Sequence, residues 1–462
     1  MNDARIPSRP RRLPPALRCA LLALFAACRI PAPGVSPEAD IAHALGVAEA
    51  VKFRVDGGPL DASEGEPASL QLGEAVQRAV AADAGLQAAL ARVRAAQAEA
   101  ELAGLLPNPI LDLVLRFPEG GGKTHIEAGL GADLLAILQR PRRASAAGHR
   151  LRAESARALS AALELLADVQ QRYSDVQALE QLVVVLERRL GLLEQIREVA
   201  EARLDVGEGT LHEVTTLDAE RTELSVEVAQ RRRELRIARL ALARRIGEPS
   251  GTAAWNLDPW SAPARVPTEE QAWIAAALSA RPEILAIAWE LRAREDEEAL
   301  ARGEPFAGAT AGLDAERDGA WSLGPGLALP VPLFDTGRAR GARARALTAE
   351  ERHRLTEAER GIVEDTRTAL VALLGAEADL ERVAGELIPL QERRRAQIEE
   401  AYRLGHVDVT ALLFADQALQ GAEARRVELE REVSSASYRL QRAVGGPSAF
   451  NAVVSAAQQS KP

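Results

Sequence analysis

Residues 323–338 read LGPGLALPVPLFDTGR, and this stretch indicates how the chain is built. Its apolar residues stand at every second position, as in a strand with one apolar face: Leu323, Pro325, Leu327, Leu329 and Val331. The alternation ends at Asp-Thr-Gly-Arg, and a long helix is predicted just after it, over residues 340–403. A soluble hairpin with one buried face would give the same alternation, so the strand alone leaves its surroundings open.

Landmarks along the whole chain, among them Arg338 of this stretch, recur at a constant offset of 198 residues. Pairs at this offset are Leu86 with Ile284, Pro107 with Pro305, Arg140 with Arg338, Gly207 with Gly405, and Asp218 with Asp416. A constant offset is the mark of internal repetition. We therefore predict two tandem repeats, 67–250 and 267–447, joined by a Pro-rich linker at 251–266. The N-terminal segment 28–66 and the C-terminal tail 448–462 are expected to be irregular.

Each repeat is predicted to contain a helix, a hairpin of two strands and a pair of very long helices. In repeat 1 these are a helix at 72–104, strands at 110–117 and 124–137, and helices at 143–204 and 210–246. In repeat 2 they are a helix at 268–302, strands at 306–315 and 321–333, and helices at 340–403 and 409–444. A long helix with one apolar stripe cannot bury that stripe alone, so the helices must pack in antiparallel pairs and then against other pairs.

The composition favours long helices and gives no sign of catalysis. Only 3% of the 462 residues are aromatic, and the formal net charge of −10 makes nucleic acid an unsuitable partner. None of the six histidines stands at the spacing of a known metal-ligand motif, so no metal, no cofactor and no catalytic residue are predicted. Gly122-Lys123-Thr124 matches the end of a phosphate-binding loop, but Phe117 replaces the first glycine of that motif.

The N-terminus has the layout of a secretory signal peptide at residues 1–27. A basic start is followed by a short apolar run, Cys19–Ala27, which falls short of the roughly 20 residues of a membrane-spanning helix. The small residues before Cys28 are similar to a bacterial lipobox, which would make Cys28 a lipidated first residue. Plain signal-peptidase cleavage near Ala27 is the alternative, since Phe25 stands where a lipobox prefers Leu.

Four stretches resemble the TolC-like outer membrane factor family, the outer membrane efflux proteins. They are Leu72–Val76, Leu105–Pro109, Leu329–Arg338, and Tyr402–Gly405 followed by Asp408. The resemblance covers about residues 67–447. It implies a mainly α fold with a small β part: a homotrimer whose α-helical barrel, or tunnel, is continuous with a twelve-stranded transmembrane β-barrel. Each subunit would give four strands, and closure follows because lipid does not tolerate open sheet edges.

The same resemblance implies a function in transport. Such proteins are passive export ducts in the outer membrane of Gram-negative cells, with a long periplasmic extension. They dock a periplasmic adaptor, the membrane fusion protein, of an inner-membrane RND or ABC pump. The Leu-Pro-Asn-Pro junction at 106–109 is similar to the branch that serves heavy-metal RND pumps, so heavy-metal cations and drugs are the two substrate classes considered. A periplasmic coiled-coil scaffold lipoprotein without a pore is the alternative from another class.

The adaptor-docking surface is expected at the two Gly-rich turns between the long helices. The residues that match it are Val206, Gly207, Thr210, Leu404, Gly405 and Asp408. Ordinary turn chemistry would also place glycines there, so both interpretations stay open. Some family members close the tunnel with aspartates where this chain has Ala411 and Phe414. Phe414 and Glu213 are therefore the candidate gate residues, with core packing and solvation as the respective alternatives.

Overall fold

The computed structural model describes residues 30–46, 51–60, 68–117, 119, 121, 124–260, 263, 265–318 and 320–459. The predicted signal peptide and Cys28 lie outside these residues, as do Gly122 and Lys123. Among the described residues, none of the helices combines the length and the apolar character that a membrane span requires. The chain forms two compact units, and each takes segments from both halves of the sequence. Unit 1 comprises residues 1–35, 92–155 and 286–355, and unit 2 comprises residues 36–91, 156–285 and 356–462.

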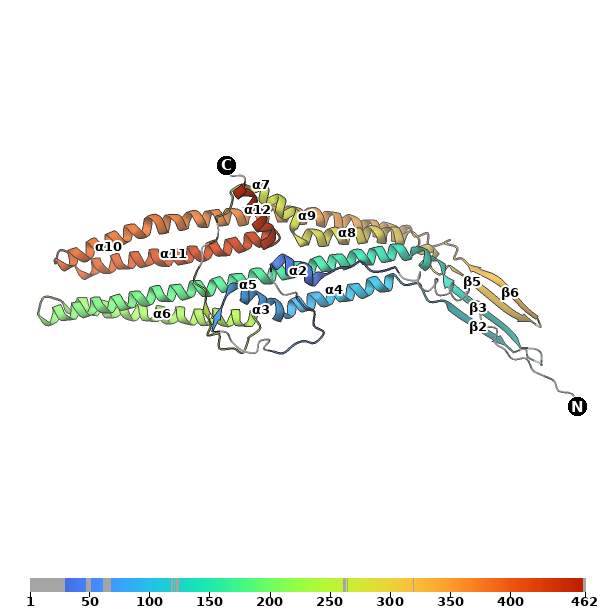
Figure 1. The fold of residues 1–462 in the computed structure, drawn as a ribbon, viewed down its shortest axis with the longest axis horizontal. Coiled ribbons are helices and arrows are strands. Elements are labelled where there is room, and N and C mark those ends of the chain that lie inside the picture. Colours follow the sequence, from blue (N-terminus) through green and yellow to red (C-terminus); the bar gives the residue numbers. More distant parts are fainter. Residues whose placement is uncertain are drawn as a thin grey trace. The chain divides into compact units, whose positions relative to one another are not determined.

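Unit 1 contains an antiparallel sheet of four strands in the order β2-β3-β5-β6 (Figure 1). The strands are β2 (Ile110–Arg116), β3 (His125–Asp133), β5 (Thr310–Asp318) and β6 (Ala320–Ala328). The hairpins of the two sequence halves join where β3 pairs with β5, with Leu130 opposite Leu313. The prediction began the first strand of this half four residues too early, at 306, and ended the second strand five residues too late, at 333. A turn of 3-10 helix at Glu304–Phe306 (η1) delays β5, and the prolines at 330 and 332 cannot extend the ladder beyond β6.

The helices that reach into unit 1 are α4 (Ala84–Ala103), α5 (Leu134–Asp205), α8 (Pro282–Ala301) and α9 (Arg338–Arg382). The prediction that α5 starts at residue 143 was wrong, because the helix begins nine residues earlier and runs through Pro141. Asp133 makes this start favourable, since its carboxylate accepts a hydrogen bond from the Ala136 N–H at 2.8 Å. Near the proline, the Arg143 guanidinium donates a hydrogen bond to the Ala136 carbonyl at 2.7 Å.

The start of α5 also closes the ends of two neighbouring helices. The Arg140 Nε donates to the Gly104 carbonyl at 2.9 Å, just after the last residue of α4. The Gln139 amide donates to the Leu300 carbonyl of α8 at 3.2 Å. Each of these carbonyls also accepts a backbone N–H, from Ile30 at 3.2 Å and from Gly303 at 3.0 Å, so the side chains add a second hydrogen bond at the two helix C-termini. Arg140, one of the residues that recurs at the 198-residue offset, thus has a structural role at this junction.

Unit 2 consists of helical hairpins and a small layer around their middle. Its elements, besides parts of α5 and α9, are α2 (Pro37–Leu45), α3 (Leu72–Ala82), α6 (Leu211–Arg245), α7 (Glu270–Ala280), η2 (Val383–Leu387), α10 (Ile388–Arg403), α11 (Val409–Ala443), α12 (Pro447–Gln459), β1 (Ser69–Leu70) and β4 (Asn256–Leu257). Helices α5 and α6 run side by side, as do α10 and α11 (Figure 1). One apolar cluster surrounds Trp273, Leu373 and Leu440, and a second surrounds Leu193 and Leu217.

The first helix of each repeat was predicted to be continuous and is broken in the structure. Asp83 separates α3 from α4 with an extended backbone, φ −66° and ψ 116°. Its carboxylate accepts from the Leu86 N–H at 2.7 Å and so caps the helix that follows. Arg281 interrupts the second repeat at the equivalent position, φ −69° and ψ 123°, and its guanidinium is bonded to Asp365 at 3.1 Å.

Segments expected to be irregular contain ordered elements. The N-terminal segment includes α2, and the C-terminal tail forms α12, whose Phe450 ring lies 5.2 Å from that of Trp273. In the linker, β4 pairs in parallel with β1. The buried Tyr173 hydroxyl fixes this ladder, because it donates to the Leu70 carbonyl at 2.9 Å and accepts from the Asp258 N–H at 3.0 Å. Burial raises the pKa of Tyr173 to about 12.

Candidate channel sheet and helical turns

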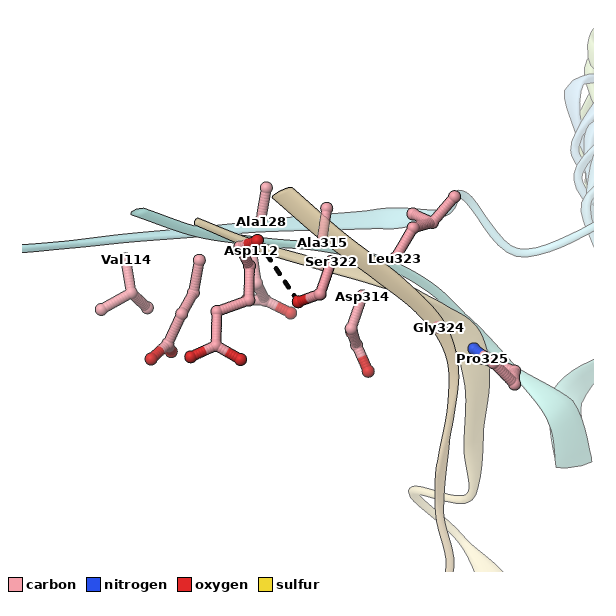
Figure 2. Close-up of a pocket in the computed structure, with 12 residues that line it drawn as sticks. Asp112, Val114, Ala128, Asp314, Ala315, Ser322, Leu323, Gly324 and Pro325 are labelled. Carbon is pink, nitrogen blue, oxygen red and sulfur yellow. Dashed lines mark hydrogen bonds between the residues drawn. The ribbon is translucent and has the colours of Figure 1, made fainter. Parts of the chain in front are cut away.

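The sheet of unit 1 has one apolar and one polar face. Side chains alternate along each strand, so every cross-strand row belongs to one face. An apolar row runs through Leu113, Ala128, Ala315 and Leu323, and the adjacent polar row runs through Val114, Glu127, Glu316 and Ser322. Figure 2 shows Asp112, Val114 and Asp314 on one side of the sheet and Ala128 and Leu323 on the other. The strand register therefore separates the two kinds of side chain.

The apolar face is exposed over its whole width. Its large side chains that are at least half exposed are Leu111, Leu113, Leu130, Leu313, Trp321, Leu323 and Leu327. At the end of the face, the Arg317 guanidinium lies 5.8 Å from the centre of the Trp321 ring. Soluble monomers rarely expose a contiguous apolar patch of this kind, and an aromatic ring beside a cation is common where a membrane meets water. This face requires an apolar surrounding.

The polar face is a shallow hollow rich in carboxylates. A hollow of about 530 Å³ is lined by Asp112, Glu127, Asp314 and Glu316, among others. Arg116 offsets part of this charge, since its guanidinium bonds to the Glu127 carboxylate at 2.5 Å. The Ser322 hydroxyl donates to the Glu316 carbonyl at 3.4 Å, the dashed line in Figure 2. With four carboxylates and one guanidinium, the face attracts cations.

The two turns between the long helices have the same chemistry. Gly207 and Gly405 adopt left-handed conformations, φ +80° and +73°, which a residue with a side chain adopts only with strain. Thr210 caps α6 by accepting from the Glu213 N–H at 3.3 Å, and Asp408 caps α11 by accepting from the Ala411 N–H at 3.0 Å. Turn and cap geometry thus accounts for four of the six predicted docking residues.

Turn chemistry does not account for Val206 and Leu404. Their side chains are 72% and 61% exposed, and they occupy equivalent positions, one residue before each glycine. One exposed apolar residue is ordinary on a protein surface, but here one stands at the equivalent position of both turns. Of the six predicted residues, these two are the ones whose exposure a docked partner would explain.

An ion pair recurs behind each turn. Arg197 Nε donates to Asp218 at 2.6 Å in repeat 1, and Arg395 Nε donates to Asp416 at 3.3 Å in repeat 2. The hydrogen bond to Asp218 raises the pKa of Arg197. Asp416 is buried, and burial raises the pKa of that carboxyl although Arg395 opposes the shift. The surroundings of Asp416 in the second hairpin therefore disfavour the ionised form of its carboxyl.

The two candidate gate residues differ in their surroundings. The Glu213 carboxylate accepts from the Thr210 N–H at 3.3 Å and completes a capping box, so helix capping explains this glutamate. Phe414 is 61% exposed, so packing in the core of its own chain does not explain that ring. Thr216, at the equivalent position of the first repeat, bonds instead to the His212 carbonyl.

One cluster on the polar face could not be predicted from the sequence. His125, Glu127 and Glu316 place one potential ligand atom each within 4.8 Å of one another. His125 and Glu127 lie two residues apart and Glu316 comes from the other repeat, so no ligand motif marks them in the sequence. The strand register signals them only after β3 is paired with β5.

Comparisons with known proteins indicate the class of protein that contains this sheet and these helical hairpins. No family model matches the chain. The chain is 27% identical over 417 residues to the pyoverdine export outer membrane protein OpmQ of Pseudomonas aeruginosa, a match that covers 81% of this chain and 85% of OpmQ. It is 26% identical over 291 residues to the outer membrane efflux protein BepC of Brucella suis biovar 1, covering 59% of this chain and 61% of BepC.

Solved structures share the fold. The outer membrane protein VceC of Vibrio cholerae superposes with a TM-score of 0.70 at 19% identity, over 81% of this chain and 96% of that chain. The similarity to two outer membrane efflux proteins identifies the chain as an efflux channel of the Gram-negative outer membrane. The chain is similar in sequence to outer membrane efflux proteins and shares the fold of VceC, in agreement with its resemblance to the TolC-like outer membrane factors. A scaffold without a pore would not explain why one face of the sheet is apolar and exposed.

Proposed function

We propose that three copies of this chain close their sheets into one twelve-stranded barrel in the outer membrane and form a passive export duct without catalytic activity. The sheet carries this proposal, because its apolar face suits lipid and its acidic face suits a water-filled lumen. The strand order β2-β3-β5-β6 leaves β2 and β6 at the two edges. Each backbone group left unpaired in lipid costs several kcal/mol, so the edges need partners.

Symmetry supplies those partners. All neighbours in the sheet are antiparallel, so β2 and β6 run in opposite directions. The β6 strand of one subunit can then pair with β2 of the next in the same antiparallel manner, and a closed ring leaves no edge. Pro325 has no N–H to donate, so the proposed ladder between β6 and β2 of the next subunit would lack at most one hydrogen bond at this position.

The helical turns are proposed to dock the periplasmic adaptor of an inner-membrane pump. Val206 and Leu404 would supply apolar contact, while Gly207, Thr210, Gly405 and Asp408 would hold the turns in shape. The chain presents these two exposed apolar residues at turns whose backbone is fixed by caps. A preformed turn loses little conformational freedom on docking, so a small apolar contact is enough to contribute affinity.

The duct is proposed to close at a ring of Phe414 rather than at an acidic ring. Phe414 is exposed and apolar, and three such rings around an axis would make a constriction that excludes water. Glu213 is occupied by the capping box and is the weaker candidate. The acidic lumen face favours cationic cargo, which fits heavy-metal cations and cationic drugs, whereas OpmQ is named for the export of pyoverdine.

Conductance of the purified protein in a planar lipid bilayer, measured beside its mass in mild detergent, tests the duct. Discrete openings from a species of three chains are expected. The Phe414→Ala variant is expected to open more often than the wild type, and Thr216→Ala, at the equivalent site of the first repeat, serves as its matched control. A monomer that never inserts would overturn the barrel, and unchanged gating in Phe414→Ala would overturn the gate alone.

A further inference from the structure

The strand register places two carboxylates and an imidazole together at one end of the polar face. The His125 Nε2 atom lies 3.2 Å from Glu127 Oε1 and 3.1 Å from Glu316 Oε1. Glu127 and Glu316 are direct cross-strand partners on β3 and β5. Like charges in directly opposite positions destabilise a sheet, so this pair calls for a positive group between the two side chains.

The spacing of the three donor atoms fits a small cation. A tetrahedral zinc ion with ligands at about 2.0–2.1 Å has ligand atoms about 3.3 Å from one another. The two nitrogen-to-oxygen distances, 3.2 and 3.1 Å, lie close to that value, and all three donors are within 4.8 Å. One imidazole and two carboxylates form a mixed nitrogen and oxygen set, which suits zinc and its neighbours better than calcium or magnesium.

We propose that His125, Glu127 and Glu316 bind one divalent transition-metal cation of the zinc class, with water completing its coordination. The ion would connect β3 of the first repeat to β5 of the second and would neutralise the opposed carboxylates. The site lies on the polar face of the sheet, where solvent has access: the three side chains are 22%, 34% and 55% exposed. It is independent of the proposed duct, since the ligands come from one chain.

Arg116 is the internal competitor for this site. Its guanidinium bonds to Glu127 Oε1 at 2.5 Å and to Oε2 at 3.3 Å, so the ion and Arg116 share one carboxylate. The Arg116 side chain is 63% exposed and can turn to the second oxygen or to solvent when a cation binds. Removing this guanidinium is therefore expected to strengthen metal binding, an effect that a purely structural ion pair would not produce.

The test is a Zn²⁺ titration of the full-length protein in detergent, by chelator competition with excess Mg²⁺ present. The wild type is expected to bind one Zn²⁺ per chain. His125→Gln and Glu316→Gln are each expected to weaken binding by more than about tenfold, and Arg116→Gln to tighten it. Asp314→Asn, on the same face of β5 but outside the cluster, is the matched control and is expected to bind as the wild type does.

X-ray absorption at the zinc edge supplies a second reading, in which the wild type shows imidazole scattering and His125→Gln does not. Absence of saturable Zn²⁺ binding by the wild type, or equal weakening in Asp314→Asn, would overturn the site and reveal only a diffuse acidic face. Far-ultraviolet circular dichroism of each variant confirms that it is folded. Conductance remains a separate measurement, so a channel that conducts without binding zinc would refute this inference and leave the duct intact.

Discussion

Leu113 and Val114 are neighbours on β2 with side chains on opposite faces, which makes them a sharp test of the barrel. Leu113 belongs to the apolar row and Val114 pairs with Glu127 on the polar face. In this chain alone their exposures are similar enough, 61% and 41%, that a soluble sheet would tolerate arginine at either position. In a membrane barrel the two positions differ completely, since one faces lipid and the other faces water.

The magnitude follows from the position of Leu113 in the middle of the seven-residue strand Ile110–Arg116. Arginine facing lipid near the bilayer midplane costs about 2–4 kcal/mol per chain, so Leu113→Arg is expected to cost roughly 6–12 kcal/mol per trimer. Val114→Arg is expected to cost less than about 1 kcal/mol, because the guanidinium can pair with Glu127 across the strand.

The assay is unfolding by urea of each variant reconstituted in lipid vesicles, followed by tryptophan fluorescence. The same pair is then compared in detergent, where the difference should shrink because arginine can draw water into a micelle. Equal stability of the two variants in vesicles would refute the assignment of the faces. A larger loss for Val114→Arg would mean that the polar row faces lipid, and the barrel would have to be inverted or abandoned.

Three further predictions concern unit 2. Val206→Asp and Leu404→Asp should each lower the amount of adaptor that co-purifies with the protein by more than about tenfold, while the melting temperature stays unchanged. Retention of the adaptor by both variants would show that the turns only connect helices. Asp416 has a pKa raised by burial, so its contribution to stability is present below the ordinary value of 3.8 and is lost as pH rises through the raised value. The difference in unfolding free energy between the wild type and Asp416→Asn should therefore change across that window, and a difference independent of pH would contradict the assignment. Tyr173→Phe should destabilise the chain by about 1–3 kcal/mol, because the β1–β4 ladder loses a hydrogen-bond donor and an acceptor in a buried site. Thermal unfolding measures this difference in free energy. A value within about 0.5 kcal/mol of the wild type, on the scale of surface changes, would show that water replaces the hydroxyl.

The sequence predicted features that depend on local periodicity or on residues required at one position. The strand starting at Ile110 and the turns at Gly207 and Gly405 were found because alternation and left-handed glycines leave a direct trace in the sequence. The 198-residue offset pointed to Asp218 and Asp416, and the structure shows each of them bonded to an arginine of the same hairpin. Apolar spacing also placed the long helices close to their observed ends.

Features that depend on contacts between distant segments were missed. The start of α5 was predicted nine residues too late, at 143, because nothing local shows that Asp133 caps a helix that runs through Pro141. The tail helix α12 packs through Phe450 against Trp273, a contact that periodicity cannot reveal. His125 and Glu316 become neighbours only through the pairing of β3 with β5, so a search for ligand spacing along the chain could not find them.

The two halves differ at one place that the internal repetition does not predict. Pro389 of the second repeat stands where the first repeat has Gly191. Proline lacks the N–H that would bond to the carbonyl four residues earlier, and the chain accommodates this with a turn of π-helix at Val383–Leu387, whereas α5 passes through the equivalent region as an α-helix. A π-turn rotates the side chains that follow it. The helices that lead into Val206 and Leu404 therefore differ in geometry, which is why each turn must be tested by its own substitution.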